Sequence, residues 1–286
     1  MPDIVWRISE DEAHREPSPT DAASARTRLE QGNRAFVELT DGAEQPTRVI
    51  HLTPADLGIG VDGLPPPQRP YAALVSCADA RVPAELLLNA HANELFVVRV
   101  AGGVLTEGAM GSLDFAVGNL TSMVLVASLG HTGCGAVSAA VSTYLHPTSY
   151  LAMAHSRPLL ALVQNIYGAV RLADHTLHDV HGTTVASSPG YRTALNVLAV
   201  LAQAGVNAAA LRTRIQLRSA TDRPEGSGVY GVYDLASRYV GVPGPTADWA
   251  PGLVDAPEDG PAFGHALREI AFGPRITHLL DADTGV

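Results

Sequence analysis

Aromatic residues, cysteines and clusters of basic residues are scarce in this sequence of 286 residues. Aromatic side chains make up 5% of it against 46% hydrophobic residues, so the core must be built mainly from Ala, Val and Leu, which suits helices packed closely on a sheet. The 19 Lys and Arg residues are outnumbered by 29 Asp and Glu residues, which gives a net charge of -10. Because phosphate binding needs clustered Lys and Arg, we expect neither a nucleic acid nor an anionic membrane as partner.

Long apolar runs are also missing. No stretch reaches the roughly eighteen uninterrupted apolar residues of a membrane span, and residues 1–6 lack a cationic region followed by an apolar stretch of signal-peptide length. We therefore expect a cytoplasmic protein. In a reducing cytoplasm the two cysteines are better explained as ligands or free thiols than as a disulfide.

Short apolar runs alternate with helical segments through the middle of the chain. Such alternation predicts an α/β fold, with a mainly parallel β-sheet flanked by helices on both faces. In open sheets of this kind, ligands bind at the carboxyl ends of the strands. The expected strands are 71–76, 94–100, 122–129, 209–218 and 228–234, and the expected helices are about 83–90, 109–120, 134–145, 157–173 and 190–204.

The remaining segments suggest how the chain is divided. We expect a loose polar tail at residues 1–24, a single α/β domain at 25–242, and a C-terminal extension of unknown role at 243–286. The extension contains a possible helix at 263–272. Residues 41–69 are rich in Pro and Gly, so we expect them to form a loop.

The two cysteines both stand where strands should end. Cys77 follows the apolar run 71–75, and Cys134 follows the run 123–129 with His131 three residues before it. Two thiolates and one imidazole leave one of the four tetrahedral positions of zinc free, which distinguishes a catalytic site from a closed structural site. Two buried thiols without metal are the alternative. The matching positions at strand ends favour one zinc ion per chain.

Other polar residues in the sequence are open to simpler interpretations. Asp79 and Arg81 follow Cys77 at alternate positions, so all three side chains point the same way if the segment is extended. A surface ion pair, which contributes little, is the simplest interpretation of these two. Histidines 175, 178 and 181 fall between two expected helices, and we expect them to lie in a solvated loop and not in a second metal site.

The pattern Cys77-Ala78-Asp79-Ala80-Arg81 followed by His131-Thr132-Gly133-Cys134 resembles the β-class carbonic anhydrases. The resemblance continues through residues 95–102, 111–116, 196–197 and 228–234, and covers roughly residues 25–242. It implies a lyase, carbonate dehydratase, that hydrates carbon dioxide reversibly to bicarbonate and a proton by zinc-bound hydroxide. It also implies an N-terminal helical arm, at about 24–39, that packs on the neighbouring subunit of a homodimer or a higher even oligomer.

The resemblance further implies roles for individual residues. In the family a residue at the position of Asp79 either accepts a hydrogen bond from the zinc-bound water or takes the fourth place on zinc, and the Arg at the position of Arg81 holds it away. Gln68 has a spacing similar to that of a Gln that donates to the substrate oxygen. Phe96 and Val98 are expected to supply an apolar wall for the substrate.

One stretch of the sequence departs from the family pattern. Where the family often has Arg-x-Ala-Gly-Asn, this chain has Arg99-Val100-Ala101-Gly102-Gly103, so we expect the loop beside the site to lack a side-chain amide anchor. Arg99 is expected to brace the fold or the dimer. Two alternative functions stay open: hydrolysis of carbon disulfide or carbonyl sulfide on the same site, and a non-catalytic zinc protein closed by Asp79.

Overall fold

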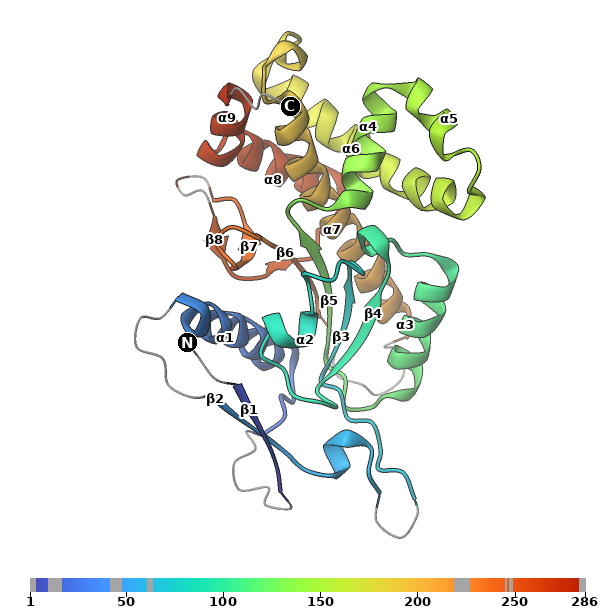
Figure 1. Cartoon of the computed structure of the whole chain (residues 1–286), viewed down its shortest axis with the longest axis vertical. Coiled ribbons are helices and arrows are strands. Elements are labelled where there is room, and N and C mark those ends of the chain that lie inside the picture. Colours follow the sequence, from blue (N-terminus) through green and yellow to red (C-terminus); the bar gives the residue numbers. More distant parts are fainter. Residues whose placement is uncertain are drawn as a thin grey trace.

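The computed structural model describes residues 4–9, 17–41, 48–60, 64–218, 227–244, 246 and 249–282. Its centre is a seven-stranded sheet in the order β4-β3-β5-β6-β7-β8, with β9 paired to β6 (Figure 1). Strands β3 to β6 pair in parallel, and β7, β8 and β9 pair antiparallel. The strands are β3 (Ala72–Ser76), β4 (Leu95–Arg99), β5 (Leu125–His131), β6 (Ser227–Tyr233), β7 (Val240–Val242), β8 (Ala250–Pro251) and β9 (Val254–Asp255).

Helices cover both faces of this sheet. Leu29 of α1 and Leu87 of α2 pack on one face with Leu74 of β3, whereas Leu113 of α3 and Leu211 of α7 pack on the other. Burial on both faces explains why the parallel strands are continuous apolar runs, and the expected fold class is confirmed. The helices are α1 (Ala22–Asp41), α2 (Ala84–Leu87), α3 (Glu107–Asn119), α4 (Gly135–Leu145), α5 (Tyr150–Met153), α6 (Arg157–His181), α7 (Tyr191–Arg218), α8 (Gly260–Phe272) and α9 (Pro274–Asp281).

Two helices are longer than the sequence suggested. The expected strand at 209–218 is wrong, because α7 runs without a break to Arg218. Its Ala-rich middle favours helix, and Leu211 and Ile215 extend its buried face. The expected loop at 175–181 is also wrong: α6 continues to His181, because Val170, Ala173 and Leu177 keep a buried stripe at helical spacing.

Helix α7 is the one helix in the described ranges that is long and apolar enough to span a membrane. However, 78% of its most apolar 18-residue window is buried inside the protein. It packs against β5, β6 and α6, so it serves as the central core helix of this fold.

The N-terminal region contains a small second sheet. Strand β1 (Ile4–Ile8) pairs in parallel with β2 (Arg48–Leu52), below α1 and apart from the central sheet (Figure 1). The expectations of a loose tail at 1–24 and of a loop at 41–69 therefore each missed a strand. Both strands are rich in β-branched residues, which was the available signal. Helix α1 matches the expected N-terminal arm, and its buried face contacts α2 of the same chain.

The C-terminal segment packs onto the rest of the fold. Helix α8 contacts α6 and α7, and α9 contacts α7 (Figure 1). The helix expected at 263–272 is confirmed, since it coincides with most of α8. At the start of α7, Gly190 donates from its backbone to the carbonyl of Leu280 at 3.2 Å. A Cβ at this glycine would lie 1.6 Å from the carbonyl oxygen of Leu279, so only glycine permits this close approach.

Candidate metal centre

The three expected metal ligands converge at the carboxyl edge of the sheet. Cys77 follows β3, His131 ends β5, and Cys134 precedes α4. Because β3 and β5 are parallel neighbours, their carboxyl ends meet. The two Sγ atoms are 3.9 Å apart, and the three potential ligand atoms all lie within 4.8 Å of one another. All three side chains are buried.

The imidazole of His131 is held in the form that binds metals. Its Nδ1 lies 3.0 Å from the carbonyl oxygen of Thr132, and because a carbonyl only accepts, Nδ1 carries the proton. Nε2 then carries the lone pair that can bind a metal together with the two cysteines. Nε2 is buried without a hydrogen-bond partner among the described residues. A buried polar atom left in this way is unfavourable by about 1–3 kcal/mol, and a bound metal ion would satisfy it.

The close approach of the two sulfur atoms shifts the pKa values of the two cysteines in opposite directions. Cys77 Sγ accepts from the backbone N–H of Gly102 at 3.2 Å. The adjacent Cys134 thiol, with smaller contributions from neighbouring donors, lowers the pKa of Cys77, while the same pairing and burial raise the pKa of Cys134. The hydrogen bond from Gly102 favours the thiolate of Cys77, which is the form in which a cysteine binds a metal. Two sulfurs and one imidazole nitrogen are the donors that zinc prefers, so the residues fit this metal.

Asp79 borders this group of donors, and Arg81 holds its carboxylate. Arg81 donates from its backbone N and from Nε to Oδ1 at 2.8 and 3.0 Å, and from Nη2 to Oδ2 at 2.8 Å. These bonds hold the pKa of Asp79 well below its usual range. Arg81 Nη2 also donates to the carbonyl of Gly133 at 3.2 Å. The pair therefore connects the segment after β3 to the loop that carries His131 and Cys134.

Arg99 fixes the same segment from the other side. Its Nε donates to the carbonyl of Cys77 at 3.2 Å, and its Nη2 donates to the carbonyl of Asp79 at 2.6 Å. Arg99 ends the neighbouring strand β4, so the two strand ends are joined by a side chain where the ladder stops. This is the bracing role within the fold that the sequence predicted.

The loop after β4 is anchored by an amide that the sequence did not reveal. Gly102 and Gly103 have φ angles of 69° and 62°, which suit glycine. Asn207 of α7 donates from Nδ2 to the carbonyl of Gly103 at 2.8 Å. The expectation that this loop lacks an amide anchor is therefore wrong. Asn207 lay beyond the expected end of its helix, so no sequence signal placed it here.

A second hydrogen-bond network holds Thr132, the residue that follows His131. Thr132 Oγ1 donates to Oδ1 of Asp234 at 3.1 Å and accepts from the backbone N–H of Leu235 at 2.9 Å. Asp234 is buried, and Nη2 of Arg275 in α9 lies 3.6 Å from its Oδ1. The C-terminal segment thus supplies a cation to the carboxylate that fixes the neighbour of a metal ligand.

The expected substrate contacts lie outside the pocket around the donor atoms. Gln68 is exposed on the segment before β3. Phe96 and Val98 pack on the α3 and α7 face of the sheet, partly buried. Their contacts with substrate stay predictions. The pocket itself is lined by Cys77, Gly102, Gly103, Ser128, Leu129, Gly130, His131, Cys134, Val137, Val200, Gln203, Ala204 and Asn207.

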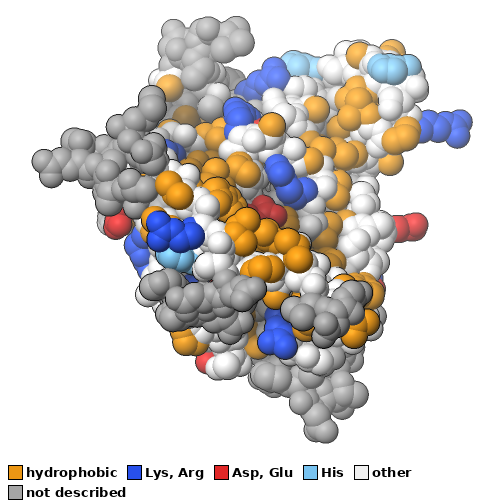
Figure 2. Space-filling view, turned by 60° about the horizontal axis from the view of Figure 1, so that its bottom comes forward, with side chains coloured by type: hydrophobic (Ala, Val, Ile, Leu, Met, Phe, Trp, Pro, Cys, Tyr) orange, Lys and Arg blue, Asp and Glu red, His pale blue; other side chains and the backbone are white. Residues whose placement is uncertain are grey.

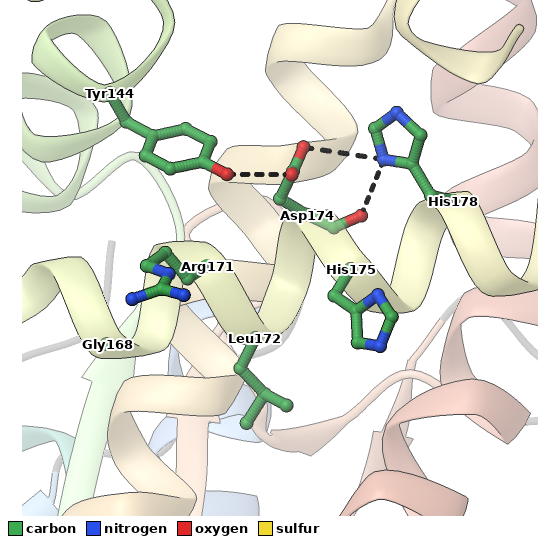
Figure 3. Close-up of a pocket in the computed structure, with 7 residues that line it drawn as sticks. All are labelled: Tyr144, Gly168, Arg171, Leu172, Asp174, His175 and His178. Carbon is green, nitrogen blue, oxygen red and sulfur yellow. Dashed lines mark hydrogen bonds and ion pairs between the residues drawn. The ribbon is translucent and has the colours of Figure 1, made fainter. Parts of the chain in front are cut away.

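A separate, open pocket lies between α4 and α6 (Figure 3). Asp174 at its base accepts hydrogen bonds from the hydroxyls of Tyr144 and Tyr191, and Nδ1 of His178 lies 3.6 Å from its Oδ1. His175 points away from this group in Figure 3. In the described part of the chain, the only cluster of three or more His, Cys, Asp or Glu side chains placed to hold a metal consists of Cys77, His131 and Cys134. Through Asp174, the hydroxyls of Tyr144 and Tyr191 tie α4, α6 and α7 together.

Comparison with known proteins agrees with this geometry. A family model described as carbonic anhydrase matches residues 72–221, just over half of the chain. "Carbonic anhydrase 2" of Mycobacterium tuberculosis is 34% identical over 123 residues, which cover 43% of this chain and 54% of that protein. A carbonic anhydrase of Mycolicibacterium smegmatis is 43% identical over 75 residues, 26% of this chain and 36% of that protein. The chain thus spans about half the length, or less, of these curated relatives.

Among solved structures, the chain is similar to the β-carbonic anhydrase CafA of Aspergillus fumigatus. The two are 22% identical with a TM-score of 0.44, and the match covers 72% of this chain and 84% of that one.

Proposed function

The chain belongs to the β-class carbonic anhydrase family, and we propose that it catalyses the reversible hydration of carbon dioxide to bicarbonate and a proton. The observation that carries this proposal is the convergence of Cys77, His131 and Cys134 beside the carboxylate of Asp79, which is bound to Arg81. The three converging residues would hold one zinc ion per chain. Because Arg81 holds the carboxylate of Asp79, this carboxylate would not occupy the place on the metal that the reaction needs.

The protein residues divide the remaining work. When bound in such a site, zinc acts as a Lewis acid and lowers the pKa of water, so that hydroxide is available near neutral pH. The carboxylate of Asp79, whose pKa is lowered by Arg81, would accept a hydrogen bond from the attacking hydroxide and so orient an oxygen lone pair toward carbon dioxide. Arg81 keeps that carboxylate in place. The N–H of Gly102 and the guanidinium of Arg99 fix Cys77, and the released proton leaves to solvent or buffer.

Two observations favour this function over the alternatives. The curated relatives described above are named carbonic anhydrases, which favours carbon dioxide over carbon disulfide or carbonyl sulfide as substrate. The three hydrogen bonds between Asp79 and Arg81 favour an open site over a non-catalytic site closed by the carboxylate.

We also propose that the chain acts as a homodimer, or a higher even oligomer, in the cytoplasm. A two-stranded sheet is at best marginally stable alone, yet Trp6 and Ile8 of β1 are each 59% exposed in the single chain. Figure 2 shows further hydrophobic side chains gathered on the face it presents. A second copy covering β1 would bury this surface, and a reducing compartment suits the free thiols of the site. Light scattering should give the mass of a dimer or of a higher even oligomer. A stable full-length monomer would contradict the proposed oligomer.

The function is tested by measuring zinc content and carbon dioxide hydration on the same preparations. Cys77→Ala, His131→Ala and Cys134→Ala should each lose zinc and activity together, because each removes one of three ligands. His175→Ala, at an exposed position on α6, is the matched control and should retain both. Wild-type protein that holds zinc but does not hydrate carbon dioxide would contradict the proposal.

A further inference from the structure

We propose that Asn207 and Gln203, two buried amides on α7, are positioning residues that hold the loop Ala101–Gly103 and thereby set the hydrogen bond from Gly102 to Cys77. The inference rests on the metal site of the proposed function, and it adds two residues of a remote helix to that site.

The two amides form a directed chain toward the loop. Gln203 donates from Nε2 to Oδ1 of Asn207 at 3.1 Å, and Asn207 donates from Nδ2 to the carbonyl of Gly103 at 2.8 Å. They are 7% and 4% exposed. Burying an amide is unfavourable unless it forms hydrogen bonds. The bond from Gln203 therefore fixes Oδ1 of Asn207 as the acceptor and leaves Nδ2 as the donor to the loop. The orientation of Asn207 is therefore determined by its neighbour one helical turn away.

The loop needs this anchor because it has no regular ladder of its own. Gly102 and Gly103 adopt left-handed φ angles in succession. A Cβ at Gly102 would lie 2.9 Å from Cδ1 of Ile166, so the loop is pressed against α6. Gly103 is buried, and its carbonyl would be unsatisfied without Asn207. Fixing that carbonyl limits rotation of the preceding peptides, one of which carries the Gly102 N–H.

That N–H acts directly on a ligand atom. It lies 3.2 Å from Sγ of Cys77, so it withdraws electron density from the thiolate and keeps the sulfur in place. Partners of this kind, one step removed from the metal, typically change metal affinity by about 10–100-fold when they are lost. Asn207 acts one step further out, through the loop.

The test uses the cobalt(II)-loaded full-length protein, because thiolate-to-cobalt absorption bands report on the sulfur directly. Asn207→Leu and Asn207→Asp both remove the donor to Gly103, and only the second adds a charge. In both variants the bands should move to lower energy, because a thiolate that has lost its N–H donor is easier to oxidise. The affinity for cobalt, measured by competition with a chelator, should also fall about tenfold. Asn165→Asp, the same change at an exposed amide of α6, should match the wild type.

Wild-type bands and wild-type cobalt affinity in loaded Asn207→Leu and Asn207→Asp would overturn the proposal. A second measurement does not require the variants to fold: in wild-type protein loaded with cadmium-113, the Gly102 amide proton should show a scalar coupling to the metal through Cys77, and the Asn207 amide protons should exchange slowly. Absence of this coupling together with rapid exchange of the Asn207 amide protons would also overturn the proposal. Wild-type protein that takes up neither metal would contradict the metal site and this inference together, whereas loss of hydration activity alone would contradict only the proposed function.

Discussion

Oδ2 of Asp79 lies 3.8 Å from Nε2 of His131 while the same carboxylate accepts hydrogen bonds from Arg81. The carboxylate is therefore next to a metal ligand but bound to a cation. As long as Arg81 holds it, it would not approach a bound metal. An anionic oxygen is a competent zinc ligand. Removing Arg81 should accordingly close the site without emptying it.

Arg81→Ala should retain zinc and lose activity by at least about tenfold, the lower end of the effect of losing an outer partner of a metal site. The freed carboxylate of Asp79 would take the position that the reaction needs. Zinc analysis and stopped-flow hydration on the same sample measure both quantities. Arg171→Ala, at an exposed position on α6, is the control and should change neither. Full activity in Arg81→Ala would refute the restraint.

Replacing Gly102 or Gly168 by Ala should change the stability of the protein in opposite directions. Gly102→Ala places a Cβ 2.9 Å from Cδ1 of Ile166 at a φ of 69°, so it should lower stability and weaken metal binding. Gly168 lies within α6 with no heavy atom within 4 Å of the added Cβ, so Gly168→Ala should raise stability by about 0.5–1 kcal/mol. Urea unfolding of both variants measures the difference. Equal effects in the two variants would contradict the account of the loop.

The ion pair between Arg275 and Asp234 should matter more than a surface pair of the same length. Arg275→Ala leaves the carboxylate of Asp234, which is 4% exposed, without its cation. We expect a loss of about 1–3 kcal/mol in the free energy of unfolding. Arg268 and Asp179 are also 3.6 Å apart, but their side chains are 48% and 37% exposed. Arg268→Ala should therefore change stability by less than about 1 kcal/mol. Equal losses would show that the C-terminal segment does not support the Thr132 loop in this way.

Tyr230 should make the protein less stable at high pH. Burial raises the pKa of Tyr230 to about 12, so the folded state favours the neutral phenol. Its stabilising contribution is complete below the pKa of the unfolded chain, near 10, and is lost as the pH rises toward the folded value. Tyr230→Phe should reduce the loss of stability between pH 8 and pH 11 by an amount on the order of 1 kcal/mol, measured by urea unfolding. Tyr167→Phe, at a partly buried position on α6, is the control. An unchanged loss in Tyr230→Phe would contradict the assignment.

The sequence was sufficient for the metal ligands because each belongs to a short pattern at the end of an apolar strand. It was insufficient for the residues that hold them. Asn207, Asp234 and Arg275 reach the site from distant parts of the chain, and the fold alone brings them together. The end of α7 was missed because its last turns, around Leu211 to Ile215, contain β-branched residues spaced as in a strand, whereas packing on the sheet keeps them helical.

Zinc K-edge X-ray absorption of the full-length protein near pH 7.5 would identify the atoms bound to the metal. We expect two sulfur scatterers at about 2.3 Å and two lighter ones at about 2.0–2.1 Å, because Cys77 and Cys134 are the only cysteines and His131 supplies the nitrogen. Replacing Cys77 by Ala should abolish this spectrum along with the bound zinc. A wild-type zinc shell with one sulfur or none would contradict the site.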